Sequence, residues 1–226
     1  MPVSDNAAIE VTGYNWVPDF AKGQVRDLRV RWALEEIGLP YKMRLMHPAK
    51  PRPEGYVREQ PFEQVPVYHE NGVHLFESGA ILVHIGEKDE RLLPRDAQGK
   101  GRAIGWVFAA LNSVEPALQN LAMIAFFNKD EEWAKLRRQG AEDFARLKLK
   151  RISDWLGDKP WLEDRFTIGD IMMACVLRIV EPMGLVDTFP NLRAYLDRLV
   201  ARPAFKAALD AQLADFTAAA PELVPA

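Results

Sequence analysis

The pair Asn71-Gly72 constrains the fold of this chain more than any other local feature. It separates two runs rich in apolar and β-branched residues, 65–69 (VPVYH) and 73–76 (VHLF). Both residues of an Asn-Gly pair tolerate the positive φ of a two-residue hairpin turn, so the sequence predicts an antiparallel hairpin here. Ser78 follows directly and is typical of a helix start, which predicts a helix from Ser78 to about residue 87.

A strand–helix–strand pattern precedes the hairpin. Residues 9–16 are rich in β-branched and aromatic side chains, and residues 41–46 alternate polar with apolar. Between them, residues 24–37 place apolar side chains three and four apart, and Gly38 follows as a helix terminator. This order predicts a parallel βαβ unit, followed by the hairpin and its helix. We therefore expect a mixed α/β domain over residues 1–90.

The remainder of the chain shows helical patterns and no strand signal. Residues 91–101 carry Pro94, Gly99 and Gly101, which favours a linker. Residues 102–226 are then expected to form an all-helical domain, with helices over 102–126, 131–156, 166–179 and 190–213, the last broken near Pro203. Thr167 and Asp170 match the capping-box pattern at the start of the third of these helices.

Composition narrows the class of function. Hydrophobic residues make up 48% of the 226 and charged residues 27%, which indicates a folded chain rather than a disordered one. The 29 Lys and Arg against 32 Asp and Glu give a net charge of -3, which argues against a nucleic-acid partner. The chain has no bilayer-length apolar run and no signal-like N-terminus, so we expect no membrane association and a cytoplasmic location.

Cysteine and histidine usage is sparse. The single cysteine, Cys175, excludes an intrachain disulfide and lies in an apolar run typical of a core helix. The four histidines do not show the spacing of zinc ligands, so no metal site is expected.

Three segments resemble the cytosolic glutathione transferase superfamily, in its bacterial form. They are 30–41 (VRWALEEIGLPY), 61–67 (PFEQVPV) with 75–81 (LFESGAI), and 166–171 (FTIGDI). The resemblance implies a thioredoxin-like N-terminal domain joined to an all-helical C-terminal domain. It also implies a homodimer, glutathione as co-substrate and a role in detoxification.

The resemblance places the glutathione site on five residues. Glu77 would meet the ammonium group of the γ-glutamyl end. Ser78 would bind its carboxylate, together with the free N–H groups of the helix start. Val65 and Pro66 would pair with the cysteinyl backbone like an added strand, with Pro66 in the cis form, and Gln64 would add a side-chain contact.

The residue that activates the glutathione thiol is the main departure from the family. Alignment of the first helix puts the usual Ser or Cys near residues 24–27, where this chain has neither. Three alternatives stay open: Tyr14 as a phenol donor, Arg26 as a charged donor at the helix start, and Gln24 as a neutral donor. Thiolate is the nucleophile, so the activating residue of a transferase would lower the pKa of the bound thiol.

Other positions are candidates for substrate contacts. Trp16, Phe20 and Trp106 are aromatic candidates for the electrophile pocket, although each also suits a structural role. Lys22, Lys50 and Arg52 are candidates for the glycine carboxylate of glutathione, and each also reads as a solvated loop charge.

Three functions remain open. The leading hypothesis is a transferase in which the glutathione thiolate attacks a small hydrophobic electrophile. A glutathione-dependent disulfide reductase and a non-catalytic interaction module are the alternatives.

Overall fold

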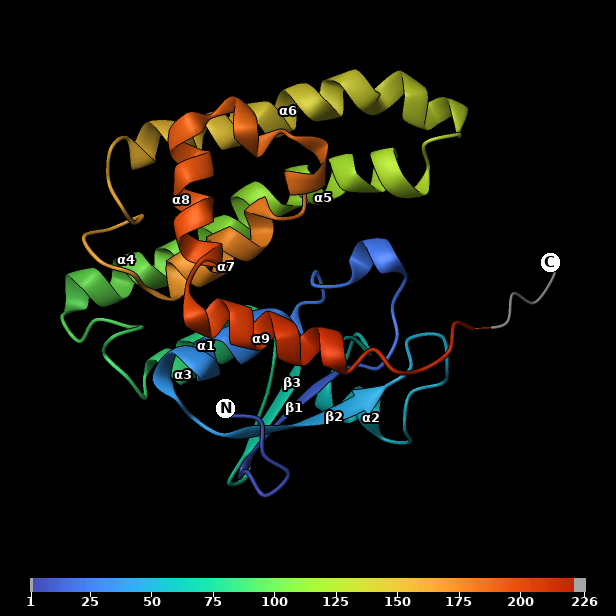
Figure 1. Ribbon diagram of the computed structural model, residues 1–226, viewed down its shortest axis with the longest axis vertical. Coiled ribbons are helices and arrows are strands. Elements are labelled where there is room, and N and C mark those ends of the chain that lie inside the picture. Colours follow the sequence, from blue (N-terminus) through green and yellow to red (C-terminus); the bar gives the residue numbers. More distant parts are fainter. Residues whose placement is uncertain (1, 222–226) are drawn as a thin grey trace. The chain divides into compact units, whose positions relative to one another are not determined.

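The structure is a computed structural model that describes residues 2–221 (Figure 1). The chain divides into two compact units. The first joins Met1–Lys88 with Pro203–Ala226, and the second is Asp89–Arg202. Residue 1 of the first expected domain, and residues 222–226 of the expected helical domain, lie outside the described residues.

A four-stranded mixed sheet forms the first unit, in the order β2-β1-β3-β4. The strands are β1 (Ile9–Tyr14), β2 (Tyr41–Met46), β3 (Val67–Glu70) and β4 (Val73–Phe76). Strand β1 pairs with β2 in parallel and with β3 in antiparallel, and β3 pairs with β4 in antiparallel. Asn71 and Gly72 both have positive φ, so the predicted hairpin is confirmed. The sheet and its helices confirm the predicted thioredoxin-like fold of the N-terminal part.

The first unit also contains helices. They are η1 (Asp19–Ala21), α1 (Asp27–Ile37), α2 (Tyr56–Glu59), α3 (Ser78–Gly86) and α9 (Pro203–Ala214). Helix α1 begins three residues after the predicted start, because residues 24–26 form successive turns instead: Gln24 N–H donates to Ala21 C=O and Leu28 N–H to Val25 C=O. Gly38 ends α1 in the left-handed conformation, as predicted.

Helix α1 is buried on nearly all sides, from Asp27 to Leu34. Part of its cover is α9, which returns from the end of the chain and lies beside α1 (Figure 1). Trp32 of α1 meets Phe205 of α9 edge to face, with ring centroids 4.9 Å apart. The sequence-based division placed residues 203–226 with the helical domain. An amphipathic pattern shows that a helix has a buried face, but not which unit it joins.

A buried polar network ties the end of the chain to the start of α1. Arg31 Nε donates to Asp27 Oδ2 (2.7 Å), and Arg31 Nη2 donates to Asp215 Oδ2 (2.5 Å). Gln212 Nε2 donates to Asp27 Oδ1 (2.8 Å). Asp27, Arg31 and Gln212 are each only 1% exposed, so these polar groups depend on one another rather than on water for hydrogen bonds.

The described part of the second unit is helical. Its elements are α4 (Ala97–Phe108), η2 (Ala109–Val114), α5 (Glu115–Ala122), η3 (Met123–Phe127), α6 (Glu132–Leu156), α7 (Ile168–Leu177), η4 (Glu181–Met183), η5 (Val186–Thr188) and α8 (Pro190–Val200). Helix α4 starts inside the segment expected to be a linker, because the Asp96 side chain caps it by accepting from Gly99 N–H (2.7 Å). The helix widens to π form in η2, just before Pro116, whose ring nitrogen has no N–H to donate.

The predicted capping box is confirmed at α7. Thr167 Oγ1 accepts from Gly169 N–H (3.2 Å), and Asp170 Oδ2 accepts from Thr167 N–H (2.9 Å). Cys175 lies buried in this helix, as expected. Within residues 2–221, no helix combines the length and apolar character that crossing a bilayer demands.

Candidate functional site

The loop before β3 holds the cis peptide bond that was predicted between Val65 and Pro66. Its backbone is fixed from both sides by side chains of other elements. Tyr56 of α2 donates its hydroxyl to Gln64 C=O (2.6 Å), and Thr12 of β1 accepts from Val67 N–H (2.7 Å). Val65 lies just outside the strand ladder, and the Gln64 side chain is exposed. The loop therefore presents a fixed backbone edge at the start of β3.

The start of α3 brings together Glu77 and Ser78. Ser78 is only 3% exposed, and its Oγ accepts a hydrogen bond from Arg29 Nη1 of α1 (3.2 Å). The exposed Glu77 has a φ of 68°, an uncommon conformation for a non-glycine residue, and its side chain caps nothing. The first N–H groups of a helix have no partner inside the helix. This corner thus combines a buried cation, a hydroxyl, free N–H groups and an exposed carboxylate.

Sequence reasoning missed Arg29. The sequence pattern did not single it out, because arginine is usually exposed, yet its exposed fraction is only 3%. The burial of Arg29 could have been inferred from the apolar side chains of α1, which are distributed around the helix. A helix with apolar side chains on all faces is buried. Its partner Ser78 is 49 residues away, which no local pattern reveals.

Tyr14 ends β1, is half-buried and packs against the cluster formed by Met46, Tyr56, Val65 and Val67. Its hydroxyl oxygen accepts from Arg52 Nη2 (3.2 Å). Burial raises the pKa of Tyr14, and the charge of Arg52 opposes part of that increase. The phenol therefore stays protonated at neutral pH and able to donate.

The other two candidate activators lie in or beside the turns that lead into α1. Gln24 is half-buried, whereas Arg26 is exposed and occupies the N-cap position without a side-chain capping bond. Both make contacts of their own.

The candidate pocket aromatics of the first unit lie in the loop after β1. Trp16 is half-buried and stacks on His47, with ring centroids 5.6 Å apart. The His47 Nε2 atom in turn lies 3.2 Å from Ala219 C=O, so this aromatic pair is joined to the end of the described chain. Phe20 is 54% exposed in η1.

Trp106 belongs to the second unit, on α4. Its indole N–H donates to Glu163 Oε1 (2.5 Å), and its ring lies against Trp155, with centroids 5.5 Å apart. Arg102 also donates to Glu163, through Nη2 (2.6 Å). These contacts give Trp106 a structural role within its own unit, and a place in a substrate pocket stays a prediction.

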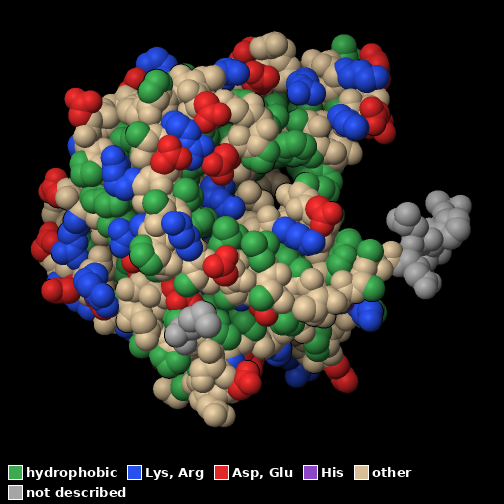
Figure 2. Space-filling model, viewed as in Figure 1, with side chains coloured by type: hydrophobic (Ala, Val, Ile, Leu, Met, Phe, Trp, Pro, Cys, Tyr) green, Lys and Arg blue, Asp and Glu red, His purple; other side chains and the backbone are tan. Residues whose placement is uncertain are grey.

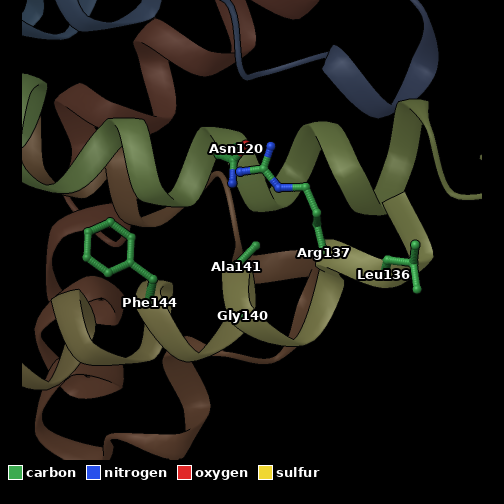
Figure 3. A pocket seen from close by; sticks show the side chains of 6 residues that line it. All are labelled: Asn120, Leu136, Arg137, Gly140, Ala141 and Phe144. Carbon is green, nitrogen blue, oxygen red and sulfur yellow. The ribbon is translucent and has the colours of Figure 1, made fainter. Parts of the chain in front are cut away.

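The second unit also contains a groove of about 400 Å³ between α5 and α6, which Figure 3 shows from close by. Its lining consists of Asn120, Leu136, Arg137, Gly140, Ala141 and Phe144, none of which was a predicted site residue. Among residues 2–221, no group of three or more His, Cys, Asp or Glu is placed to hold a metal ion. Figure 2 shows acidic and basic side chains interspersed over the face drawn.

Comparison with known proteins matches both parts of the chain to family models. Residues 14–87 match the model described as "Glutathione S-transferase, N-terminal domain", and residues 122–198 match "Glutathione S-transferase, C-terminal domain". Together the two models span most of the chain and include every candidate residue of the cis-proline loop and of the start of α3.

Individual relatives agree in fold and differ in reaction. A glutathione S-transferase-like protein of Aspergillus terreus is 26% identical, covering 81% of this chain and 89% of its own length. A maleylacetoacetate isomerase of Pseudomonas aeruginosa is 27% identical, covering 84% of this chain and 94% of its own. A glutathione transferase structure from Burkholderia graminis, with two glutathione molecules bound per subunit, superposes with a TM-score of 0.77 at 26% identity and covers 92% of this chain and 90% of its own.

Proposed function

The chain belongs to the glutathione S-transferase family, and from that premise we propose that it binds glutathione in its first unit. The bound thiolate attacks a small hydrophobic electrophile. The observation that carries this proposal is the corner at the start of α3, where Ser78 accepts a hydrogen bond from the buried Arg29 next to the exposed Glu77.

The charges of this corner suit the zwitterionic γ-glutamyl end of glutathione. Arg29 carries only donors, so its bond to Ser78 uses the oxygen of Ser78 and leaves the hydroxyl hydrogen for a ligand carboxylate. The α3 helix dipole and its first N–H groups favour the same anionic group. Glu77, exposed beside it, supplies the negative charge for the ligand ammonium.

The cis-proline loop suits the cysteinyl part of glutathione. The fixed backbone edge at Val65 offers peptide groups to an extended tripeptide, as in strand addition. Gln64 is exposed next to it for a side-chain contact. Tyr14 packs against the cluster that includes Val65 and holds a protonated phenol, which makes it our preferred thiol activator over Gln24 and Arg26.

Calorimetric titration of glutathione into the wild type and into Ser78→Ala tests the proposal. Loss of a charge-assisted hydrogen bond costs roughly 1.5–3 kcal/mol, so Kd should increase about 10- to 150-fold. Ser4→Ala, an exposed serine of the same unit, is the matched control and should bind like the wild type. Wild-type protein that binds no glutathione at millimolar concentration would refute the proposal.

Two assays separate the reactions that remain open. Conjugation of an aryl halide supports the transferase, whereas turnover of hydroxyethyl disulfide without conjugation supports a glutathione-dependent disulfide reductase. The lack of Ser and Cys at residues 24–27 is the observation that supports the reductase as the alternative. Glutathione binding without either activity would instead indicate an interaction module.

We extend the proposal to a homodimer. Large apolar side chains on η3 and α6 are exposed in the single chain, among them Phe127 at 54%, Leu136 at 78% and Phe144 at 51%. The elements η3 and α6 pack against each other, and exposed apolar side chains on neighbouring elements are typical of interaction sites. Sedimentation velocity of the purified protein decides between monomer and dimer.

A further inference from the structure

Arg52 donates three hydrogen bonds, which reach the segment before the cis-proline loop, the residue after β2 and Tyr14 at the end of β1. Its Nε donates to Glu63 C=O (2.8 Å), just before the cis-proline loop. Its Nη1 donates to His47 C=O after β2 (3.1 Å), and its Nη2 donates to the Tyr14 hydroxyl at the end of β1 (3.2 Å). One side chain therefore joins both parallel strands to the loop that presents Val65.

The hydrogen bond from Arg52 determines which way the hydroxyl hydrogen of Tyr14 can point. A guanidinium group has donors and no acceptor, so the Tyr14 oxygen must accept the bond from Arg52. The single phenol hydrogen is then left for another acceptor. Within residues 2–221, the Tyr14 hydroxyl makes no hydrogen bond besides the one from Arg52.

The two side chains are also held face to face. The guanidinium carbon of Arg52 lies 5.3 Å from the centroid of the Tyr14 ring, within the range of a cation–π contact. Arg52 lies between Pro51 and Pro53, whose fixed φ angles restrict the backbone on both sides. A left-handed backbone at Glu63, with φ of 55°, places its carbonyl where Arg52 Nε reaches it.

We propose that Arg52 is a positioning residue that acts through Tyr14: it orients the phenol hydrogen towards the glutathione sulfur and strengthens that hydrogen bond by its charge. The inference rests on the proposed function, because it needs bound glutathione. In the step it assists, the S–H bond of glutathione breaks and the proton leaves to solvent water. The electron pair stays on sulfur, and Tyr14 keeps its proton while donating to the thiolate.

The inference predicts a measurable shift in the ionisation of bound glutathione. The thiolate is followed by its ultraviolet absorbance in a pH titration of the saturated complex. Wild-type protein should hold the thiol pKa below the free value of about 8.5. Arg52→Gln should raise that pKa by about one unit, a tenfold smaller thiolate fraction at a fixed pH below both values.

Tyr14 provides the decisive comparison. Tyr14→Phe should raise the thiol pKa by a similar amount, and adding Arg52→Gln to Tyr14→Phe should raise it no further, because Arg52 acts through the hydroxyl. Arg52→Lys keeps a charge and a donor, so it should recover part of the shift, and it serves as the second variant if Arg52→Gln folds poorly.

Arg44→Gln is the matched control. Arg44 also lies over a tyrosine ring in this unit, 5.7 Å from the centroid of Tyr56, but it pairs with Glu59 rather than with a tyrosine hydroxyl. It should leave the thiol pKa unchanged.

Two results would overturn the inference while glutathione binding persists. One is weaker binding of glutathione by Arg52→Gln at an unchanged thiol pKa, which would make Arg52 a direct carboxylate contact. The other is a full additional shift from Arg52→Gln in the Tyr14→Phe background. Absence of glutathione binding by the wild type is a separate outcome, and it refutes the proposed function itself.

Discussion

Replacing Gly169 with alanine should destabilise the second unit, although the same change in an ordinary helix stabilises it. A Cβ added at Gly169 would lie 2.6 Å from Trp106 Cβ and 3.3 Å from Ala103 C=O. Carbon atoms in good contact are about 3.5–4.0 Å apart, so the shortfall is about 1 Å. Rotation of the Trp106 side chain cannot relieve it, because a Cβ is fixed by the backbone, and therefore α4 and α7 must separate.

The magnitude follows from two opposing terms. Overpacking of this severity lowers the free energy of unfolding by about 3 kcal/mol, and the higher helix propensity of alanine raises it by about 1 kcal/mol. The free energy of unfolding should therefore fall by about 2 kcal/mol. With a urea m-value of about 2 kcal/mol/M, the unfolding midpoint should fall by about 1 M.

Gly105→Ala on α4 is the matched control. A Cβ at Gly105 meets nothing within 4 Å, so only the propensity gain of about 1 kcal/mol remains and the midpoint should increase. Urea unfolding followed by tryptophan fluorescence measures both variants. If Gly169→Ala proves as stable as Gly105→Ala, the close approach of α4 and α7 at Trp106 is wrong.

Two further changes test electrostatic contacts in the first unit. Hydrogen bonds from Arg44 hold the Glu59 pKa below its usual 4.5, so the ion pair stabilises the folded state above pH 4.5 and this stabilisation is lost as pH falls. Glu59→Gln should therefore weaken the decrease of the urea unfolding midpoint at acid pH. An unchanged decrease would contradict this prediction. Asp215→Ala removes one carboxylate from the buried Arg31 and should lower the free energy of unfolding by about 2 kcal/mol. Asp210→Ala, an exposed aspartate within α9 five residues earlier, is the control and should change that free energy by less than about 0.5 kcal/mol.

Local patterns predicted the elements whose determinants are local. The hairpin at Asn71-Gly72 and the capping box at Thr167 follow from turn and cap chemistry within a few residues, and the structure contains both. The start of α4 was missed for the opposite reason. Gly99 and Gly101 lower helix propensity and resemble a linker, whereas the Asp96 cap and the packing of the helix outweigh them.

The candidate site was only partly accessible to sequence reasoning. Family resemblance singled out Glu77 and Ser78 as candidates, and it predicted the cis form of Pro66, which the structure confirms. No local pattern in the sequence indicates the hydrogen bonds made by Arg29 and Arg52, because their partners Ser78 and Tyr14 are distant in the chain. Whether a charged residue on a helix is solvated or buried depends on what covers that helix, which for α1 includes α9 from the far end of the sequence.

The return of α9 to the first unit also dictates an order of events during synthesis. When residue 88 leaves the ribosome, the sheet and α1 are complete in sequence, yet Trp32 still lacks Phe205, and Arg31 still lacks Asp215. The whole second unit must be translated before those partners emerge. Throughout elongation, the nascent N-terminal unit therefore exposes apolar side chains of α1 together with Arg31, which is buried in the complete protein. Holdase chaperones bind exposed apolar surface of this kind. A premature stop codon anywhere before residue 203 leaves the N-terminal unit in that state permanently.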